Sequence, residues 1–162
     1  AHKVQRGAAG YRKQHSGNGT TPLSTNAKIL FLHHSTGENV WGGGTISGNP
    51  GSCRYWLNQY NSAHGTNYQV TETWFPGDPS GVPYPSDNFP YDFWNVWCNP
   101  NKDAAAQTQT TLETFVSQYD MIIFKHCFIT SYIQPDTGTP DVTSPSRTLE
   151  NYKAQYAVLK AS

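Results

Sequence analysis

Charged side chains are scarce in this sequence of 162 residues, at 14%, whereas typical soluble domains carry about 25%. The 11 basic and 11 acidic side chains cancel, so no net charge draws the chain to nucleic acid or to an anionic membrane. No apolar run approaches the roughly 18 residues of a membrane-spanning helix. We therefore expect no nucleic-acid partner and no membrane span. The low charge, with abundant Gly, Pro, Asn, Ser and Thr, indicates a secreted, loop-rich protein.

Cysteine is also scarce, and the three present, Cys53, Cys98 and Cys127, are too widely spaced for a Cys-x-x-Cys metal site. They allow one disulfide. We expect Cys53 to pair with Cys98, because both lie in polar, loop-like surroundings, and the alternative is three unpaired thiols. The first residues lack the apolar core of a signal peptide, so we expect that an export signal has already been removed.

Residues 1–26 are rich in Gly, Ser, Asn and Thr, carry scattered basic groups and show no hydrophobic periodicity. This composition predicts an extended or disordered N-terminal arm. The remaining segment, residues 27–162, has the length of one ordinary domain. We therefore expect a single folded unit behind the arm.

Short apolar segments that predict strands alternate with segments of helical spacing. Strands are expected over 28–32, 68–74 and 121–124, and helices over 52–62, over 103–118 with Asp103 as N-cap, and in a last helix that opens at Ser144-Pro145. The glycine-rich segment 37–51 and the segment 75–100, with its many prolines and aromatic side chains, are expected to be irregular.

This order of strands and helices is typical of crossovers onto a parallel sheet, so the predicted fold is α/β, a three-layer α/β/α arrangement of the flavodoxin-like kind. The first and third strands are short and wholly apolar, as fully buried strands are. The last helix carries the apolar stripe Leu149, Tyr152, Tyr156 and Leu159, but no strand follows it. We therefore expect the sheet to be incomplete at the C-terminus and the chain to be the front portion of a longer protein.

Ligands of open parallel sheets bind beyond the carboxyl ends of the strands, and three short segments follow the predicted strands. These segments contain His33, His34 and Ser35 after the first strand, Gly77 after the second, and Lys125, His126 and Cys127 after the third. A serine hydroxyl becomes a nucleophile when a base accepts its proton, and an oxyanion needs converging N–H donors. The segments hold every group for nucleophilic catalysis except an orienting carboxylate, and Ser35 is the candidate nucleophile.

The segments ILFLHHSTGENVW, YDMIIFKHCFITSYI and TLENYKAQYAVL resemble a branch of the SGNH/GDSL hydrolase superfamily found in secreted bacterial proteins. In that superfamily a Gly-Asp-Ser-type block after the first strand supplies the nucleophile, and later loops supply a glycine and an asparagine to the oxyanion hole. The resemblance implies an SGNH-type sheet, with Ser35 as the nucleophile in a His-Ser-Thr-Gly version of the first block. It also implies Gly77 as the oxyanion-hole glycine, an extracellular location, no cofactor and no metal.

Two departures from the family pattern affect the site. Lys125-His126-Cys127 stands where the superfamily has Gly-x-Asn-Asp, so the third oxyanion donor is either a backbone N–H or the His126 side chain. The superfamily's catalytic Asp-x-x-His occurs nowhere in the sequence. Because the resemblance covers about residues 28–160, we expect the catalytic base to come from sequence beyond this chain.

The candidate residues also have structural alternatives. Ser35 fits a helix N-cap or a turn, and His33 and His34 alternate in direction, so that one is buried while the other faces the cleft. Cys127 is either a small residue packed under the sheet or a nucleophile activated by its cationic neighbours. Lys125 needs either a buried ion pair or an anion in the cleft. A zinc site from the histidines of these segments has no ligand spacing to support it.

Two functions remain open at this point. The first is a secreted serine ester hydrolase of SGNH type, which removes acyl groups from a glycan or a similar substrate after attack by Ser35. The second is a non-catalytic extracellular protein that binds or self-assembles and retains part of the hydrolase fold, because an unpaired sheet edge invites pairing with another chain. The missing Asp-x-x-His favours the second function, and the strand-turn context of Ser35 favours the first.

Overall fold

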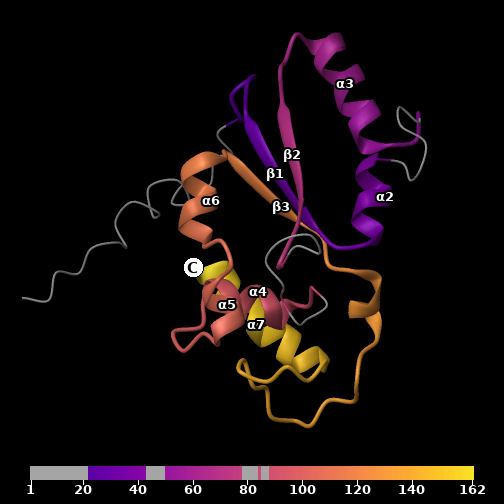
Figure 1. The fold of residues 1–162 in the computed structure, drawn as a ribbon. Coiled ribbons are helices and arrows are strands. Elements are labelled where there is room, and N and C mark those ends of the chain that lie inside the picture. Colours follow the sequence, from indigo (N-terminus) through magenta and orange to yellow (C-terminus); the bar gives the residue numbers. More distant parts are fainter. Residues whose placement is uncertain (1–21, 43–49, 78–83, 85–87) are drawn as a thin grey trace, which may run out of the picture.

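The computed structural model describes residues 22–42, 50–77, 84 and 88–162 (Figure 1). The predicted N-terminal arm lies outside these residues except for its last segment, 22–26. Within that segment the carbonyl of Thr25 accepts a hydrogen bond from the N–H of Asn67, at 2.7 Å. This bond ties the chain just before the first strand to the chain just before the second.

A three-stranded parallel sheet forms the centre of the fold. Its strands are β1 (Lys28–His33), β2 (Gln69–Trp74) and β3 (Met121–Phe124), and their order is β2-β1-β3. In the register, His33 lies opposite Trp74 and Leu32 lies opposite Phe124, so all three strands end at the same edge. The prediction of an α/β fold with an open parallel sheet is confirmed.

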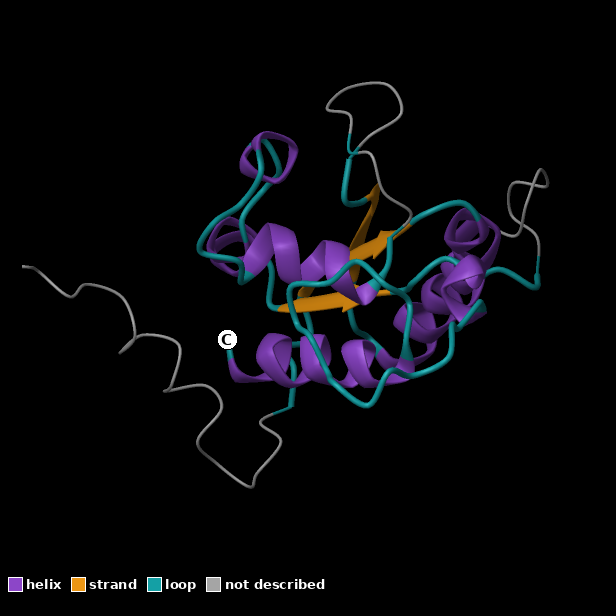
Figure 2. Ribbon diagram, turned by 90° about the horizontal axis from the view of Figure 1, so that it is seen from below, coloured by secondary structure: helices purple, strands orange, loops and turns teal. Residues whose placement is uncertain are grey.

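Helices occupy both sides of the strands (Figures 1 and 2). They are α2 (Thr36–Gly42), α3 (Cys53–His64), α4 (Pro90–Trp97), α5 (Ala104–Gln107), α6 (Leu112–Gln118), the 3₁₀ turn η1 (Phe128–Ser131) and α7 (Leu149–Ala161). Figure 1 places α2 and α3 on one side of the strands and α6 on the other. Helices α4 and α7 pack against each other.

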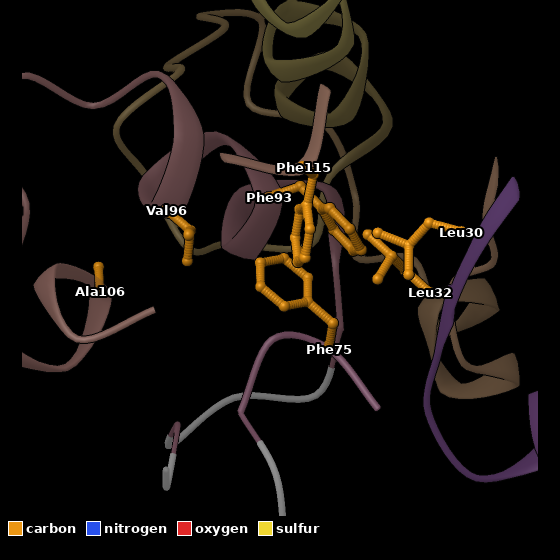
Figure 3. Packing of buried hydrophobic residues seen from close by; sticks show 7 residues of the cluster. All are labelled: Leu30, Leu32, Phe75, Phe93, Val96, Ala106 and Phe115. Atoms are coloured by element: carbon orange, nitrogen blue, oxygen red, sulfur yellow. The ribbon is translucent and has the colours of Figure 1, made fainter. Parts of the chain in front are cut away.

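Side chains of β1 alternate between two apolar surfaces, as the period of a strand requires. Leu30 and Leu32 point into the main core, where they meet Phe75, Phe93 and Phe115 (Figure 3). On the opposite face, the ring of Phe31 contacts Trp41 of α2, with ring centroids 6.2 Å apart. Burial on both faces explains why residues 29–32 of β1 are an uninterrupted apolar run.

Two segments predicted to be irregular contain helices, so these predictions were wrong in part. Helix α2 (Thr36–Gly42) covers the start of the segment 37–51, because its Trp41 gains an apolar partner in Phe31 of the sheet. Residues 43–49 lie outside the described residues. Within 75–100, helix α4 starts with Pro90 at its first position, where the missing N–H costs nothing. The carboxylate of Asp92 accepts the Phe89 N–H at 2.6 Å and caps that helix.

Three other predictions need correction. The predicted helix 103–118 is two helices, because Thr111 caps a new start at Leu112, although Asp103 is the N-cap expected of it. The last helix begins at Leu149 behind the N-cap Thr148, not at Ser144-Pro145. Strand β3 is not fully buried, since Met121 is 38% and Ile123 is 44% exposed.

The predicted disulfide is absent, and Cys53, Cys98 and Cys127 are all free thiols. Cys53 begins α3, which packs with α2 on the Phe31 side of the sheet, whereas Cys98 ends α4, whose side chains fill the core on the other side. The sheet therefore separates the two thiols. The loop-like composition around Cys53 and Cys98 gave no information on this separation.

Candidate functional site

The segments that follow the three strands meet at the carboxyl edge of the sheet. His34, after β1, donates from Nε2 to the carbonyl of Pro76, after β2, at 2.7 Å. Lys125, after β3, donates from Nζ to the hydroxyl of Thr36, after β1, at 2.7 Å. The segment after the central strand is thus hydrogen-bonded to the segments that follow both neighbouring strands, at the edge where the topology rule places ligand sites.

Ser35 lies at the turn between the central strand and α2, with its side chain exposed. Its φ of 41° is in the left-handed region, which costs a residue with a Cβ atom about 1–2 kcal/mol. An N-cap residue normally has an extended backbone and accepts an N–H with its side chain. Here the N–H groups of Gly37 and Glu38 donate instead to the backbone carbonyls of His34 and Ser35, both at 2.9 Å. The hydroxyl of Ser35 is therefore not used for capping.

His33 is buried and is held by a carboxylate. Its Nε2 is paired with Glu72 of β2, which lies two residues before Trp74, the residue opposite His33, and on the same face of the sheet. The α2 residue Gly37 lies directly on this imidazole, because a Cβ atom at that position would overlap the Cβ and Cγ of His33. Nδ1 is buried and has no partner among the described residues. His33 thus packs against Gly37 at the start of α2.

His34 is buried as well, and it does not face an open cleft. Its ring stacks on Trp74 with centroids 4.4 Å apart, while Nε2 donates to Pro76. The Nε2 atoms of both histidines of the first segment are thus engaged by groups other than Ser35. The expectation that one of the two is buried and the other faces the cleft is therefore wrong, since both are buried.

Gly77 has a φ of 72°, a conformation that favours glycine. Its N–H donates to Oε1 of the buried Gln109 at 2.6 Å. The donor predicted for the oxyanion hole is therefore engaged by a side chain in this structure. Gln109 was not singled out in the sequence, because an isolated Gln between two helices carries no pattern.

Asn88 is the residue that joins the loops after β2 and β3. It is fully buried with a φ of 66°, and its Nδ2 donates to the carbonyl of Phe75 at 2.7 Å. Its Oδ1 accepts the N–H of Cys127 at 2.7 Å, and its own carbonyl accepts Nδ1–H of His126 at 2.7 Å. Asn tolerates the left-handed region better than most residues. A single side chain thus fixes both loops, although nothing in the sequence marked it.

His126 sits among aromatic rings rather than in solvent. Phe93, Phe124 and Tyr156 surround it with ring centroids 5.2, 5.6 and 5.6 Å away, and its Nε2 is buried without a partner among the described residues. Burial, and to a smaller extent the charge of Lys125, lowers the pKa of His126, while the hydrogen bond to Asn88 opposes this. At neutral pH the imidazole is therefore neutral, and the ring is a packing element.

Cys127 is buried, and its N–H is bonded to Asn88, which supports the packing alternative over the nucleophile alternative. Lys125 is partly buried, and it donates to the hydroxyl of Thr36 and, at 2.9 Å, to the carbonyl of His126. The ion pair expected as one alternative for Lys125 is not found among the described residues. Lys125 and Thr36 therefore form a polar pair directly beside Ser35.

The described residues contain no group of three or more His, Cys, Asp or Glu side chains that could hold a metal ion, so the zinc alternative has no support there. In the same part of the chain, no helix is long and apolar enough to cross a membrane. Comparisons with protein-family models, with curated proteins and with solved structures find no match to this chain. What the site does must therefore be argued from its geometry.

Proposed function

We propose that this protein is a serine ester hydrolase of the SGNH type, secreted and acting on acyl esters of a glycan. The observation that carries the proposal is the position of Ser35. It is an exposed hydroxyl with a left-handed φ, at the turn from the central strand of a parallel sheet into a helix. A strained serine at such a strand-to-helix turn is the arrangement that presents a nucleophile in other α/β hydrolases.

The proposed reaction is acyl transfer through Ser35. Its Oγ attacks the acyl carbon, the bond to the glycan oxygen breaks, and water then releases the acid from the acyl-enzyme. We assign one oxyanion donor to the backbone N–H of Ser35. The N–H groups of Gly77 and Cys127 donate to Gln109 and Asn88, so the oxyanion can use either one only by displacing an amide oxygen. On this proposal, the sheet β2-β1-β3 is part of a three-layer α/β/α domain.

The test compares the purified chain with Ser35→Ala on short p-nitrophenyl esters and on an O-acetylated oligosaccharide. Ser62→Ala, a change at an exposed serine of α3, serves as the matched control. We expect a fluorophosphonate to label Ser35, as located by peptide mass spectrometry, and hydrolysis to stop in Ser35→Ala alone. Equal rates in Ser35→Ala and the wild type, or a label elsewhere, would contradict the assignment.

A second candidate function, non-catalytic self-assembly, is favoured by one specific observation. Strand β3 lies at the edge of the sheet, and its side chains Met121 and Ile123 are 38% and 44% exposed. Apolar edge strands pair readily with other chains. If this function is correct, sedimentation shows concentration-dependent association that Ile123→Lys abolishes. Glu113→Lys, a charge change on the neighbouring helix α6, is the control. A monomer at every concentration contradicts this function.

A further inference from the structure

The ammonium of Lys125 lies on the turn that carries Ser35, and its partners are neutral oxygens. It donates to Thr36 Oγ1 at 2.7 Å and to the carbonyl of His126 at 2.9 Å. No carboxylate in the described ranges lies within ion-pair distance of it. Among those residues it therefore contacts a hydroxyl of the Ser35 turn and no carboxylate.

The histidines of the site do not offer the same contact. The Nε2 of His33 is paired with Glu72, that of His34 donates to a carbonyl, and the ring of His126 is enclosed by aromatic side chains. A general base must reach the proton that it removes, directly or through one intervening group. Lys125 reaches the hydroxyl of Thr36, which is the residue next to Ser35 in the turn.

We infer that Lys125 is the proton acceptor for Ser35 and that the hydroxyl of Thr36 relays the proton. This inference rests on the proposed esterase function. Serine–lysine pairs perform the same chemistry on unrelated folds. The inference also assigns a role to Thr36, which was not among the candidate residues of the sequence.

In molecules with a neutral Lys125 amine, Ser35 Oγ bonds to the acyl carbon as its proton passes to Thr36 Oγ1, and Thr36 gives its own proton to Lys125 Nζ. The ester C–O bond then breaks: Thr36 gives its proton directly to the departing alkoxide and takes one from the Lys125 ammonium, which is neutral again. Water then attacks the acyl carbon as its proton passes through Thr36 to Lys125, and a proton returns through Thr36 to Ser35 Oγ as the Ser35–acyl bond breaks and the acid leaves.

The experiment measures the rate at which a fluorophosphonate labels Ser35, and the rate of ester hydrolysis, across the pH range. In the wild type we expect both rates to rise with pH above neutrality, because only the neutral amine accepts a proton. Lys125→Arg keeps the positive charge and the hydrogen-bond donors, yet it cannot become neutral in a protein. We therefore expect about a 100-fold or greater loss of both rates in this variant while it stays folded.

Thr36 provides the second half of the test. Thr36→Val removes the hydroxyl at nearly constant volume and should lower the labelling rate in the same way, whereas Thr36→Ser should recover it. Circular dichroism confirms the fold of each variant. If Lys125→Arg and Thr36→Val label Ser35 as fast as the wild type, with the same pH profile, the inference is overturned and the esterase proposal stands. If the wild type itself neither hydrolyses esters nor labels, both fail together.

Discussion

Replacing Asn88 with alanine should remove much of the stability of the fold, because this one side chain joins two loops in the interior. The change leaves the carbonyl of Phe75 and the N–H of Cys127 buried without partners. Each unsatisfied buried group costs about 1–3 kcal/mol. Alanine at a φ of 66° adds about 1 kcal/mol relative to asparagine. We therefore expect the free energy of unfolding to fall by about 4 kcal/mol.

The assay is equilibrium unfolding in urea, followed by far-ultraviolet circular dichroism. Asn88→Gly separates the two contributions, because glycine adopts the left-handed conformation freely but makes neither hydrogen bond. It should be about 1 kcal/mol more stable than Asn88→Ala and still well below the wild type. Asn101→Ala, at an exposed asparagine, should change the stability by no more than about 0.5 kcal/mol.

Two results would refute this reasoning about Asn88. A loss below about 1 kcal/mol in Asn88→Ala would mean that its hydrogen bonds to the two loops contribute little, or that water replaces them. A glycine variant less stable than the alanine variant would mean that the positive φ of residue 88 imposes no strain. Either outcome would also weaken the view that Asn88 fixes the segments around the candidate site.

Three further predictions concern other parts of the molecule. Gly37→Ala should destabilise the fold by more than about 2 kcal/mol, because its Cβ atom overlaps the buried imidazole beneath it, as thermal unfolding will show. Because burial lowers the pKa of His126, the unfolded chain binds a proton below about pH 6.5 that the folded chain does not. Stability, measured as Tm, should therefore fall as the pH is lowered from about 6.5, and less so in His126→Asn. Thiol titration in denaturant should find Cys53 and Cys98 reduced, and added reductant should not change Tm.

Each of these predictions has a control. Gly42→Ala places a methyl group where no atom lies within 4 Å, so it should be neutral or slightly stabilising, and a loss equal to that of Gly37→Ala would contradict the steric argument. An equally steep pH dependence in His126→Asn would show that another group binds the proton. A Tm that drops in reductant would mean that a disulfide forms in solution.

Local sequence patterns sufficed to predict the elements of the sheet. The strand 121–124 was predicted with its observed bounds, and the first two strands within one residue at either end, because apolar runs and alternation depend on neighbouring residues alone. Helices α2 and α4 were not predicted, because they form despite their local composition. Their segments are rich in glycine or proline, and a contact with the sheet or a proline at the first helical position overrides that composition.

The candidate site was predicted only in outline. The rule that chemistry follows the carboxyl ends of parallel strands selected Ser35, Gly77 and Lys125 from the sequence, and the structure places their segments at one edge of the sheet. The partners of these residues were not predictable. The side-chain oxygens of Gln109 and Asn88 accept hydrogen bonds from the N–H groups of Gly77 and Cys127, which were expected in an oxyanion hole. Both are single amide side chains that belong to no sequence motif.

By itself, the sequence determined the parallel α/β order, the lack of net charge and the serine at the end of the central strand, because each depends on composition or on adjacent residues. Only the tertiary structure decided which donors are occupied and which group can reach the serine turn. Lys125 and Thr36 are 89 residues apart in the chain, and their contact exists because β1 and β3 pair in parallel with aligned ends. Such contacts depend on the register of distant strands, which local patterns do not encode.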